Sequence, residues 1–142
     1  MKKYLWCGLA IIGVLSCKSS GIDKKDAGLK YKETLILNDV PKASLTFFDI
    51  EDGRCPEDVN CIWGGNARVD LLLSGVTVDG GINEHLKMCS GNCGGNFGED
   101  TLVKKFAGQE YRLILLEVTP NRKSTEEPKK EDYSILLKIE KK

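Results

Sequence analysis

The segment "ARVDLLLSG" at residues 67–75 decides the fold class. Val69, Leu71 and Leu73 occupy alternate positions, and polar residues such as Asp70 lie between them. Successive side chains of a β-strand point to opposite faces, so this two-residue period is typical of a strand with one buried face. The segment therefore predicts a half-buried strand.

Similar strand signals recur on both sides of this segment. Residues 133–141 alternate in the same way, and residues 33–38 and 44–50 are rich in β-branched and aromatic side chains. Residues 111–118, "YRLILLEV", are apolar on both faces, which predicts a central strand covered on each side or a strand at a sheet corner. Together these runs predict an all-β domain of six to eight strands.

The amino-terminal residues have the pattern of a bacterial lipoprotein signal. Lys2 and Lys3 precede a short apolar run at residues 5–15, which is shorter than the roughly 20 residues that span a bilayer. Val14-Leu15-Ser16-Cys17 resembles the lipobox, in which the cysteine becomes the lipidated first residue of the mature chain. We therefore expect residues 1–16 to be a signal peptide, although an ordinary secretory signal with a chance cysteine is the alternative.

The expected mature chain has a tether and one domain. Residues 17–28 are polar and without periodicity, which predicts a flexible tether, and residues 29–142 form the predicted β-domain. We expect a cell-envelope location, with a palmitate-type lipid on Cys17 holding the protein to the membrane, most simply the outer membrane with the domain in the periplasm or at the surface. The chain has 21 basic and 21 acidic residues, so no single-sign field predicts binding to nucleic acid.

Four cysteines follow Cys17 in the chain. In an oxidising compartment they predict two disulfides rather than a metal site, because neither pair has the spacing of a zinc knuckle and His85 is the only histidine. We expect no metal and no cofactor. The four cysteines are Cys55, Cys61, Cys89 and Cys93.

The four cysteines allow three pairings. Long loops would give the greater entropic stabilisation, about 4 kcal/mol against about 2 kcal/mol for a short loop. We nevertheless expect Cys55 to pair with Cys61 and Cys89 with Cys93, because Pro56 and glycine-rich flanks turn the chain back at once and short loops close faster.

The segments "DGRCP" (52–56) and "CIWGGNA" (61–67) resemble an uncharacterised family of secreted or lipid-anchored bacterial β-domains. That family's pattern is Asp-Ser-Arg-Cys-Pro followed by Cys-x-Trp-Ala-Gly-x-Ala; this chain departs from it at Gly53 and Gly64 and by the additional segment "CSGNCGGNFGED". The resemblance implies an immunoglobulin-like antiparallel β-sandwich of about seven strands, stapled at one end.

The resemblance also implies roles for two residues. Arg54 would reach a carboxylate or a carbonyl group, and Trp63 would cover the bridge between Cys55 and Cys61. Packing of Trp63 in the core is the alternative, since a buried indole contributes a large apolar area; a ligand platform is a third reading.

The sequence has no set of base, nucleophile and acid at a spacing typical of a catalytic site. We therefore expect a non-catalytic binding module, with an envelope protein or a glycan as its partner. An inhibitor or immunity-type protein of an envelope hydrolase is the first alternative. A hydrolase is the second and weakest, and its only candidate residues are Asp49, Asp52, His85 and Glu99.

Recognition by a sandwich falls to the loops at one end. The bridged loops carry polar groups for this purpose, and the expected binding residues are Arg54, Trp63, Asn92 and Asn96.

Overall fold

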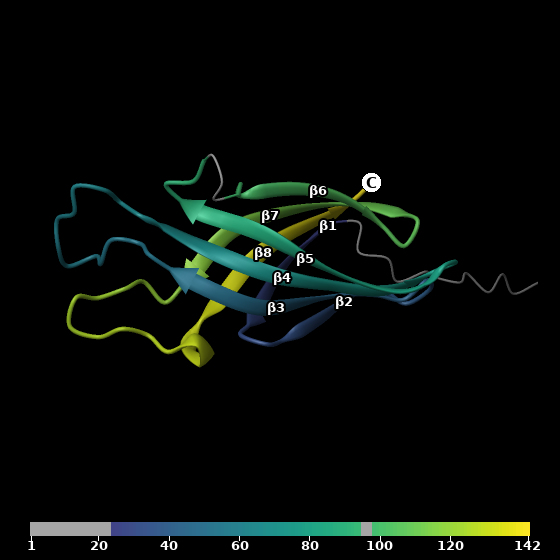
Figure 1. Ribbon diagram of the computed structural model, residues 1–142, viewed down its shortest axis with the longest axis horizontal. Helices are drawn as coiled ribbons and strands as arrows, with labels where there is room; N and C mark the ends of the chain where they lie inside the picture. Colours follow the sequence, from purple (N-terminus) through teal and green to yellow (C-terminus); the bar gives the residue numbers. More distant parts are fainter. Residues whose placement is uncertain (1–23, 95–97) are drawn as a thin grey trace, which may run out of the picture.

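The computed structural model describes residues 24–94 and 98–142, and within these residues it forms eight β-strands and one short 3₁₀ turn (Figure 1). The predicted signal peptide and Cys17 lie outside the described residues. The elements are β1 (Lys24–Lys30), β2 (Thr34–Asn38), β3 (Ala43–Asp52), β4 (Asn66–Thr77), β5 (Gly80–Gly91), β6 (Thr101–Phe106), β7 (Gln109–Thr119), η2 (Lys130–Asp132) and β8 (Ser134–Lys141).

The strands form two antiparallel four-stranded sheets that pack face to face. One sheet has the order β1-β8-β7-β6 and the other has the order β2-β3-β4-β5. The prediction of an all-β antiparallel sandwich is confirmed. Within each sheet, strands that follow one another in the chain are neighbours, and β8 also pairs with β1. The connections are therefore a meander, which differs from the Greek-key connections of immunoglobulin domains.

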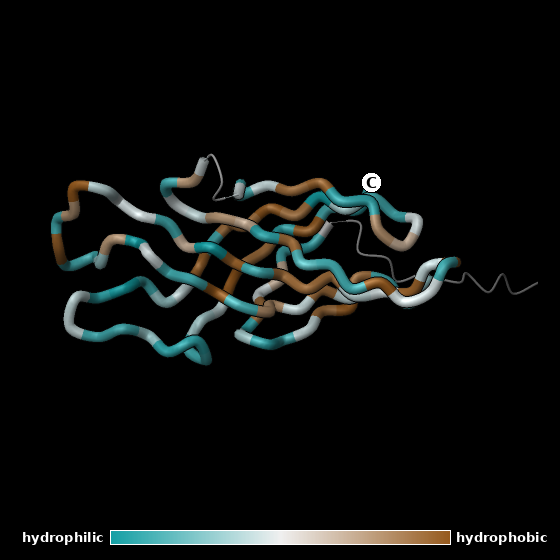
Figure 2. The backbone as a smooth tube through the Cα atoms, viewed as in Figure 1, coloured by the Kyte–Doolittle hydropathy of each residue, from teal (hydrophilic) through white to brown (hydrophobic). Residues whose placement is uncertain are grey.

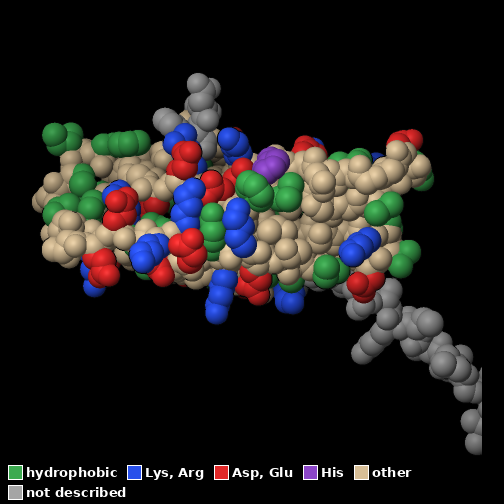
Figure 3. Space-filling model, turned by 60° about the horizontal axis from the view of Figure 1, so that its bottom comes forward, with side chains coloured by type: hydrophobic (Ala, Val, Ile, Leu, Met, Phe, Trp, Pro, Cys, Tyr) green, Lys and Arg blue, Asp and Glu red, His purple; other side chains and the backbone are tan. Residues whose placement is uncertain are grey.

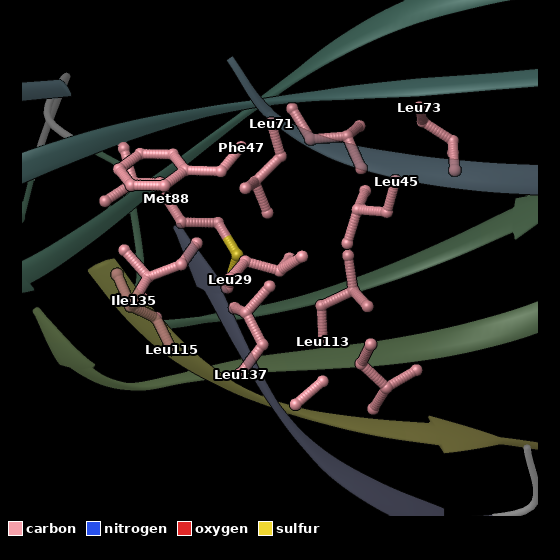
Figure 4. Packing of buried hydrophobic residues seen from close by; sticks show 14 of the residues in the cluster. Leu29, Leu45, Phe47, Leu71, Leu73, Met88, Leu113, Leu115, Ile135 and Leu137 are labelled. Carbon is pink, nitrogen blue, oxygen red and sulfur yellow. The ribbon is translucent and has the colours of Figure 1, made fainter. Parts of the chain in front are cut away.

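The core lies between the two sheets, and each strand contributes alternate side chains to it. Val69, Leu71 and Leu73 of β4 are buried, as the alternation predicts. Leu71 and Leu73 point toward the other sheet, from which Leu113 and Leu137 project (Figure 4). Figure 2 shows the same alternation as hydrophobic and hydrophilic steps along the strands. Because every strand has one buried face, the packing of the two sheets determines which residues face solvent.

A β-bulge changes the outcome expected for β7. Leu115 pairs with Leu137 and Glu117 pairs with Leu136, so Leu116 is the extra residue of the bulge. The bulge places both Leu115 and Val118 in the core and leaves Leu116 47% exposed. The prediction of a strand covered on both faces is wrong. The run looks apolar on both faces because the extra residue at the bulge switches which alternate positions face the core.

The ordered domain begins earlier than Leu29. β1 starts at Lys24 and pairs with β8 from Lys24 opposite Glu140 to Lys30 opposite Ser134. Residues 24–28 of the predicted tether are thus part of the sheet, and that boundary was wrong. The strand contributes only Ala27 and Leu29 to the core, which is too few for a visible apolar period.

Candidate interaction surface at the stapled end

The loop of residues 53–65, here called the stapled loop, joins β3 to β4 and is closed by the disulfide Cys55–Cys61. Below the bridge, Cys55 N donates to Gly64 O at 2.8 Å and Gly53 N donates to Asn66 O at 2.8 Å. The second disulfide is Cys89–Cys93, so the prediction of two local pairs is confirmed. Two disulfides indicate folding in an oxidising compartment outside the cytosol.

The two bridged segments lie side by side at one end of the sandwich, here called the stapled end. Asn92 N donates to Gly65 O at 2.9 Å, and Asn66 Nδ2 donates to Asn92 O at 3.0 Å. Within the stapled loop, Gly65 allows the two arms of its base to approach closely, because its φ is +68° and a Cβ at this position would lie 1.9 Å from Gly53 O. The base of the stapled loop is therefore packed backbone against backbone.

A buried ion pair holds the stapled loop to the sandwich. The Asp52 carboxylate accepts hydrogen bonds from Arg54 Nε at 2.8 Å and Nη2 at 2.7 Å, and from the Tyr133 hydroxyl at 2.9 Å. Of the three remaining guanidinium hydrogens, two go to the carbonyls of Val118 and Pro120, each at 2.8 Å, and one goes to Asn121 Oδ1 at 3.3 Å. The Asp52 side chain is 4% exposed and that of Arg54 is 17% exposed.

The network changes the ionisation of its members. Burial alone would raise the pKa of Asp52, but the hydrogen bonds from Arg54 and Tyr133 outweigh burial and hold that pKa below its usual range. Burial, and next the hydrogen bond to Asp52, raise the pKa of Tyr133 to about 12. Asp52 is thus an anion and Tyr133 a neutral donor across the physiological range.

The raised pKa of Tyr133 predicts a loss of stability in alkali. Unfolded tyrosine ionises near pH 10, so between about pH 10 and pH 12 the unfolded chain releases a proton that the folded chain retains. The free energy of unfolding should therefore fall as pH rises through this window. The free energy of unfolding of the Tyr133→Phe chain should fall less steeply. Urea unfolding of unlipidated Cys17→Ser chains at pH 9 and pH 11.5 measures the difference; parallel pH profiles would contradict the assignment.

The loop of residues 120–133, here called the charged loop, braces the stapled loop from the side. Glu57 N donates to Arg122 O at 3.0 Å, and Arg122 Nη1 donates to Arg54 O at 3.0 Å. Asp58 accepts from the backbone N and the hydroxyl of Ser124 at 2.8 and 2.5 Å. The charged loop therefore supports the stapled loop at Arg54, Glu57 and Asp58.

The tip of the stapled loop is apolar and faces solvent. Val59 is 45% exposed, Ile62 is 110% exposed and Trp63 is 56% exposed. The tip appears as a hydrophobic stretch in Figure 2, and hydrophobic side chains are visible at the left end of the molecule in Figure 3. Packing of Trp63 in the core is therefore wrong, since the short disulfide-closed ring beside it holds the indole at the end of the sandwich, away from the space between the sheets.

The four expected binding residues differ in their exposure and in their contacts. Arg54 is not free for a partner, because Asp52 and backbone carbonyls use its guanidinium. Asn92 is exposed but uses its backbone to join the two bridged segments. Asn96 lies outside the described residues. Trp63 is the member that the structure exposes, and sequence reasoning missed Val59 and Ile62 beside it.

Among the residues of the hydrolase alternative, Asp52 lies apart from Asp49 and His85. Asp49 lies on the outer face of the β2–β5 sheet, where it accepts a hydrogen bond from Lys130 Nζ at 2.6 Å, whereas Asp52 is buried under Arg54. On the same outer face, His85 Nδ1 lies 2.9 Å from Asp70 Oδ1. Sequence reasoning missed Asp70, because only the pairing of β4 with β5 brings it near the histidine.

A shallow groove of about 340 Å³ runs over this outer face between β3, β4 and β5. Figure 3 shows charged side chains of both signs gathered beside the histidine there. Within residues 24–94 and 98–142, no cluster of three or more His, Cys, Asp or Glu side chains is arranged to hold a metal ion. In the same part of the chain, no helix has the length and apolar character to cross a membrane.

Comparison of the chain with protein-family models, with curated proteins and with solved structures finds no significant match. A function must therefore be inferred from the residues and their geometry.

Proposed function

We propose that this protein is a lipid-anchored envelope protein that binds a partner protein through the tip of the stapled loop and catalyses no reaction. The observation that carries the proposal is the exposure of Ile62 and Trp63 on a loop fixed by a disulfide and by the Asp52–Arg54 pair. Monomeric proteins seldom expose large apolar side chains together without a partner.

The loop is suited to tight association because it is ordered before binding. A flexible loop loses entropy when it docks, and bridging and hydrogen bonding reduce that loss. Tryptophan is among the residues that dominate binding energy when they enter a partner's pocket, with typical losses of about 2 kcal/mol or more on truncation to alanine. The tip therefore has both the side chains and the rigidity of an interface centre.

A protein is a better-supported partner than a glycan. Carbohydrate recognition uses polar hydrogen-bonding groups around an aromatic face, whereas here Val59 and Ile62 flank the indole. The nearest acidic side chains are already engaged, Glu57 with Asn121 and Asp58 with Ser124. An aliphatic tip fits an apolar groove on a partner protein. If the protein is an inhibitor, that groove would belong to an envelope hydrolase.

The anchor rests on residues 14–17 and on where the domain begins. β1 starts at the end of the sandwich opposite the stapled end (Figure 1), so a lipid on Cys17 would hold the interaction surface away from the bilayer.

Labelled palmitate tests the anchor. Growing cells should incorporate it into the wild-type protein and not into Cys17→Ala. Equal labelling of the two chains would remove the anchor from the proposal.

Co-purification after crosslinking in the envelope tests the interaction surface. We expect Ile62→Ser with Trp63→Ser to lower partner recovery at least about tenfold, since about 1.4 kcal/mol corresponds to a factor of ten. The matched control is Val103→Ser with Leu116→Ser, which removes apolar side chains of similar exposure, 50% and 47%, from β6 and β7. Equal recovery from both double variants would contradict the proposal.

A further inference from the structure

A second group of exposed apolar side chains lies at the opposite end of the sandwich, here called the hairpin end. Val40, in the turn between β2 and β3, is 88% exposed, and Val78, in the turn between β4 and β5, is 101% exposed. Val76 and Ile82, on the strands just before and after the second turn, are 52% and 40% exposed. Four aliphatic side chains thus face solvent around two turns.

The side-chain hydrogen bonds within the two turns are made by other residues than the valines. Asn38 Nδ2 donates to Pro41 O at 3.0 Å in the first turn, and Thr77 Oγ1 donates to Gly80 O at 3.1 Å in the second. Turn tips favour glycine, asparagine, aspartate, proline and serine, whereas valine fits a half-buried sheet. An exposed valine at the tip of each turn therefore indicates that this end of the domain contacts an apolar surface.

The two tips point in the same direction from the same end of the molecule. Val76 N donates to Lys42 O at 3.1 Å, which joins the second hairpin to the first turn. The hairpins project side by side from the sandwich in Figure 1.

The chain enters the domain at this same end. Lys24 pairs with Glu140 next to the carboxyl terminus of β8, and Lys142 N donates to Glu110 O beside the turn between β6 and β7. Cys17 precedes Lys24 by seven residues. A chain of this length spans at most about 25 Å when fully extended.

We infer that the hairpin end rests on the lipid bilayer, with Val40 and Val78 inserted among the headgroups, so that the stapled end projects away from the membrane. This inference depends on the proposed lipid at Cys17. Amphipathic helices that lie in the membrane interface bury their apolar face by about 5–10 Å, and we expect the two turn tips to enter to a similar depth.

The tether explains why so small an apolar contact suffices. Fully burying one valine contributes about 1.5–3 kcal/mol, and two such contacts would hold a free domain only weakly. A short tether converts binding into an intramolecular event at a millimolar effective concentration, so weak contacts are enough to orient the domain. Because the chain has equal numbers of basic and acidic residues, we expect its binding not to depend on anionic lipid.

Tryptophan quenching by brominated lipid tests the orientation. Trp63 is the only tryptophan after Cys17, so the lipidated wild-type chain reports the stapled end and W63F/V78W reports the hairpin tip. The control W63F/L116W places tryptophan at the exposed bulge of β7, near the end of that strand. Each lipidated chain is reconstituted in phosphatidylcholine vesicles with plain or acyl-brominated lipid.

We expect brominated vesicles to quench the emission of W63F/V78W by about half or more, as for a side chain in the interface. The emission of the wild-type chain and of W63F/L116W should hardly change, and adding V40D to W63F/V78W should reduce the quenching. An unquenched W63F/V78W chain, or equal quenching of all three chains, would overturn the inference.

Mass spectrometry of the same samples separates the two proposals. A chain without lipid at Cys17 contradicts the anchor, whereas lipidated W63F/V78W whose emission is unquenched contradicts the orientation alone.

Discussion

Asp52→Ala is expected to destabilise the domain by about 3 kcal/mol, because it removes the counter-charge of a mostly buried guanidinium, which keeps only its bonds to Val118, Asn121 and Pro120. Arg54 would lose three hydrogen bonds, counting the one that its backbone N donates to Asp52 Oδ1 at 3.1 Å, and the Tyr133 hydroxyl would lose its acceptor. A loss of this size is a large part of the stability of a small domain. Urea unfolding of unlipidated chains with intact disulfides measures the change.

Glu51→Ala is the matched control for this experiment. Glu51 is the preceding residue of β3, its side chain is 67% exposed, and its ion pair with Arg68 lies on the surface. Exposed ion pairs contribute about 0–1 kcal/mol, so the control should remain close to the parent chain. If the two variants unfold at the same urea concentration, the buried pair does not hold the stapled loop as described.

Gly65→Ala is expected to cost about 2–5 kcal/mol. An alanine in the left-handed conformation costs about 1–2 kcal/mol, and forcing extra volume into packed structure adds about 1–3 kcal/mol. The structure has no space for the new methyl group, because its Cβ would lie 1.9 Å from Gly53 O, a backbone atom that cannot rotate away. The variant should therefore separate the two strands at the base of the stapled loop.

Gly108→Ala separates these two costs. Gly108 has a similar φ of +75°, but no atom lies within 4 Å of the position that its Cβ would take. It should therefore show only the cost of the left-handed conformation, when unfolding is measured in the same way. Equal destabilisation at the two positions would mean that the close backbone contact at Gly65 contributes nothing.

Alternation predicted the strands and the core because the two-residue period is a local property of the chain. It failed where the geometry depended on a partner strand. The bulge at Leu116 changes the phase within β7, and β1 contributes two core residues and is ordered by pairing with β8. Neither feature has a local signature as strong as the pattern of Val69, Leu71 and Leu73.

The stapled end was only partly predictable for the same reason. The pairing of Cys55 with Cys61 was expected from Pro56, from the glycine-rich flanks and from the fast closure of short loops, and the structure confirms it. The partners of Arg54 include the carbonyls of Val118 and Pro120, more than sixty residues away, so no local pattern shows that the side chain is occupied. The exposure of Trp63 had one available signal, its place beside a short disulfide ring that cannot reach the core.

Site-specific photocrosslinking in intact cells tests the central claim most directly. A photoreactive amino acid at Ile62 should give a discrete protein adduct in the envelope, and the adduct should disappear when Trp63→Ser is added. The same amino acid at Val103, which is 50% exposed on β6 opposite Arg112, should give none. No adduct from position 62, or the same adduct from both positions, would contradict the assignment of the stapled loop as the interaction surface.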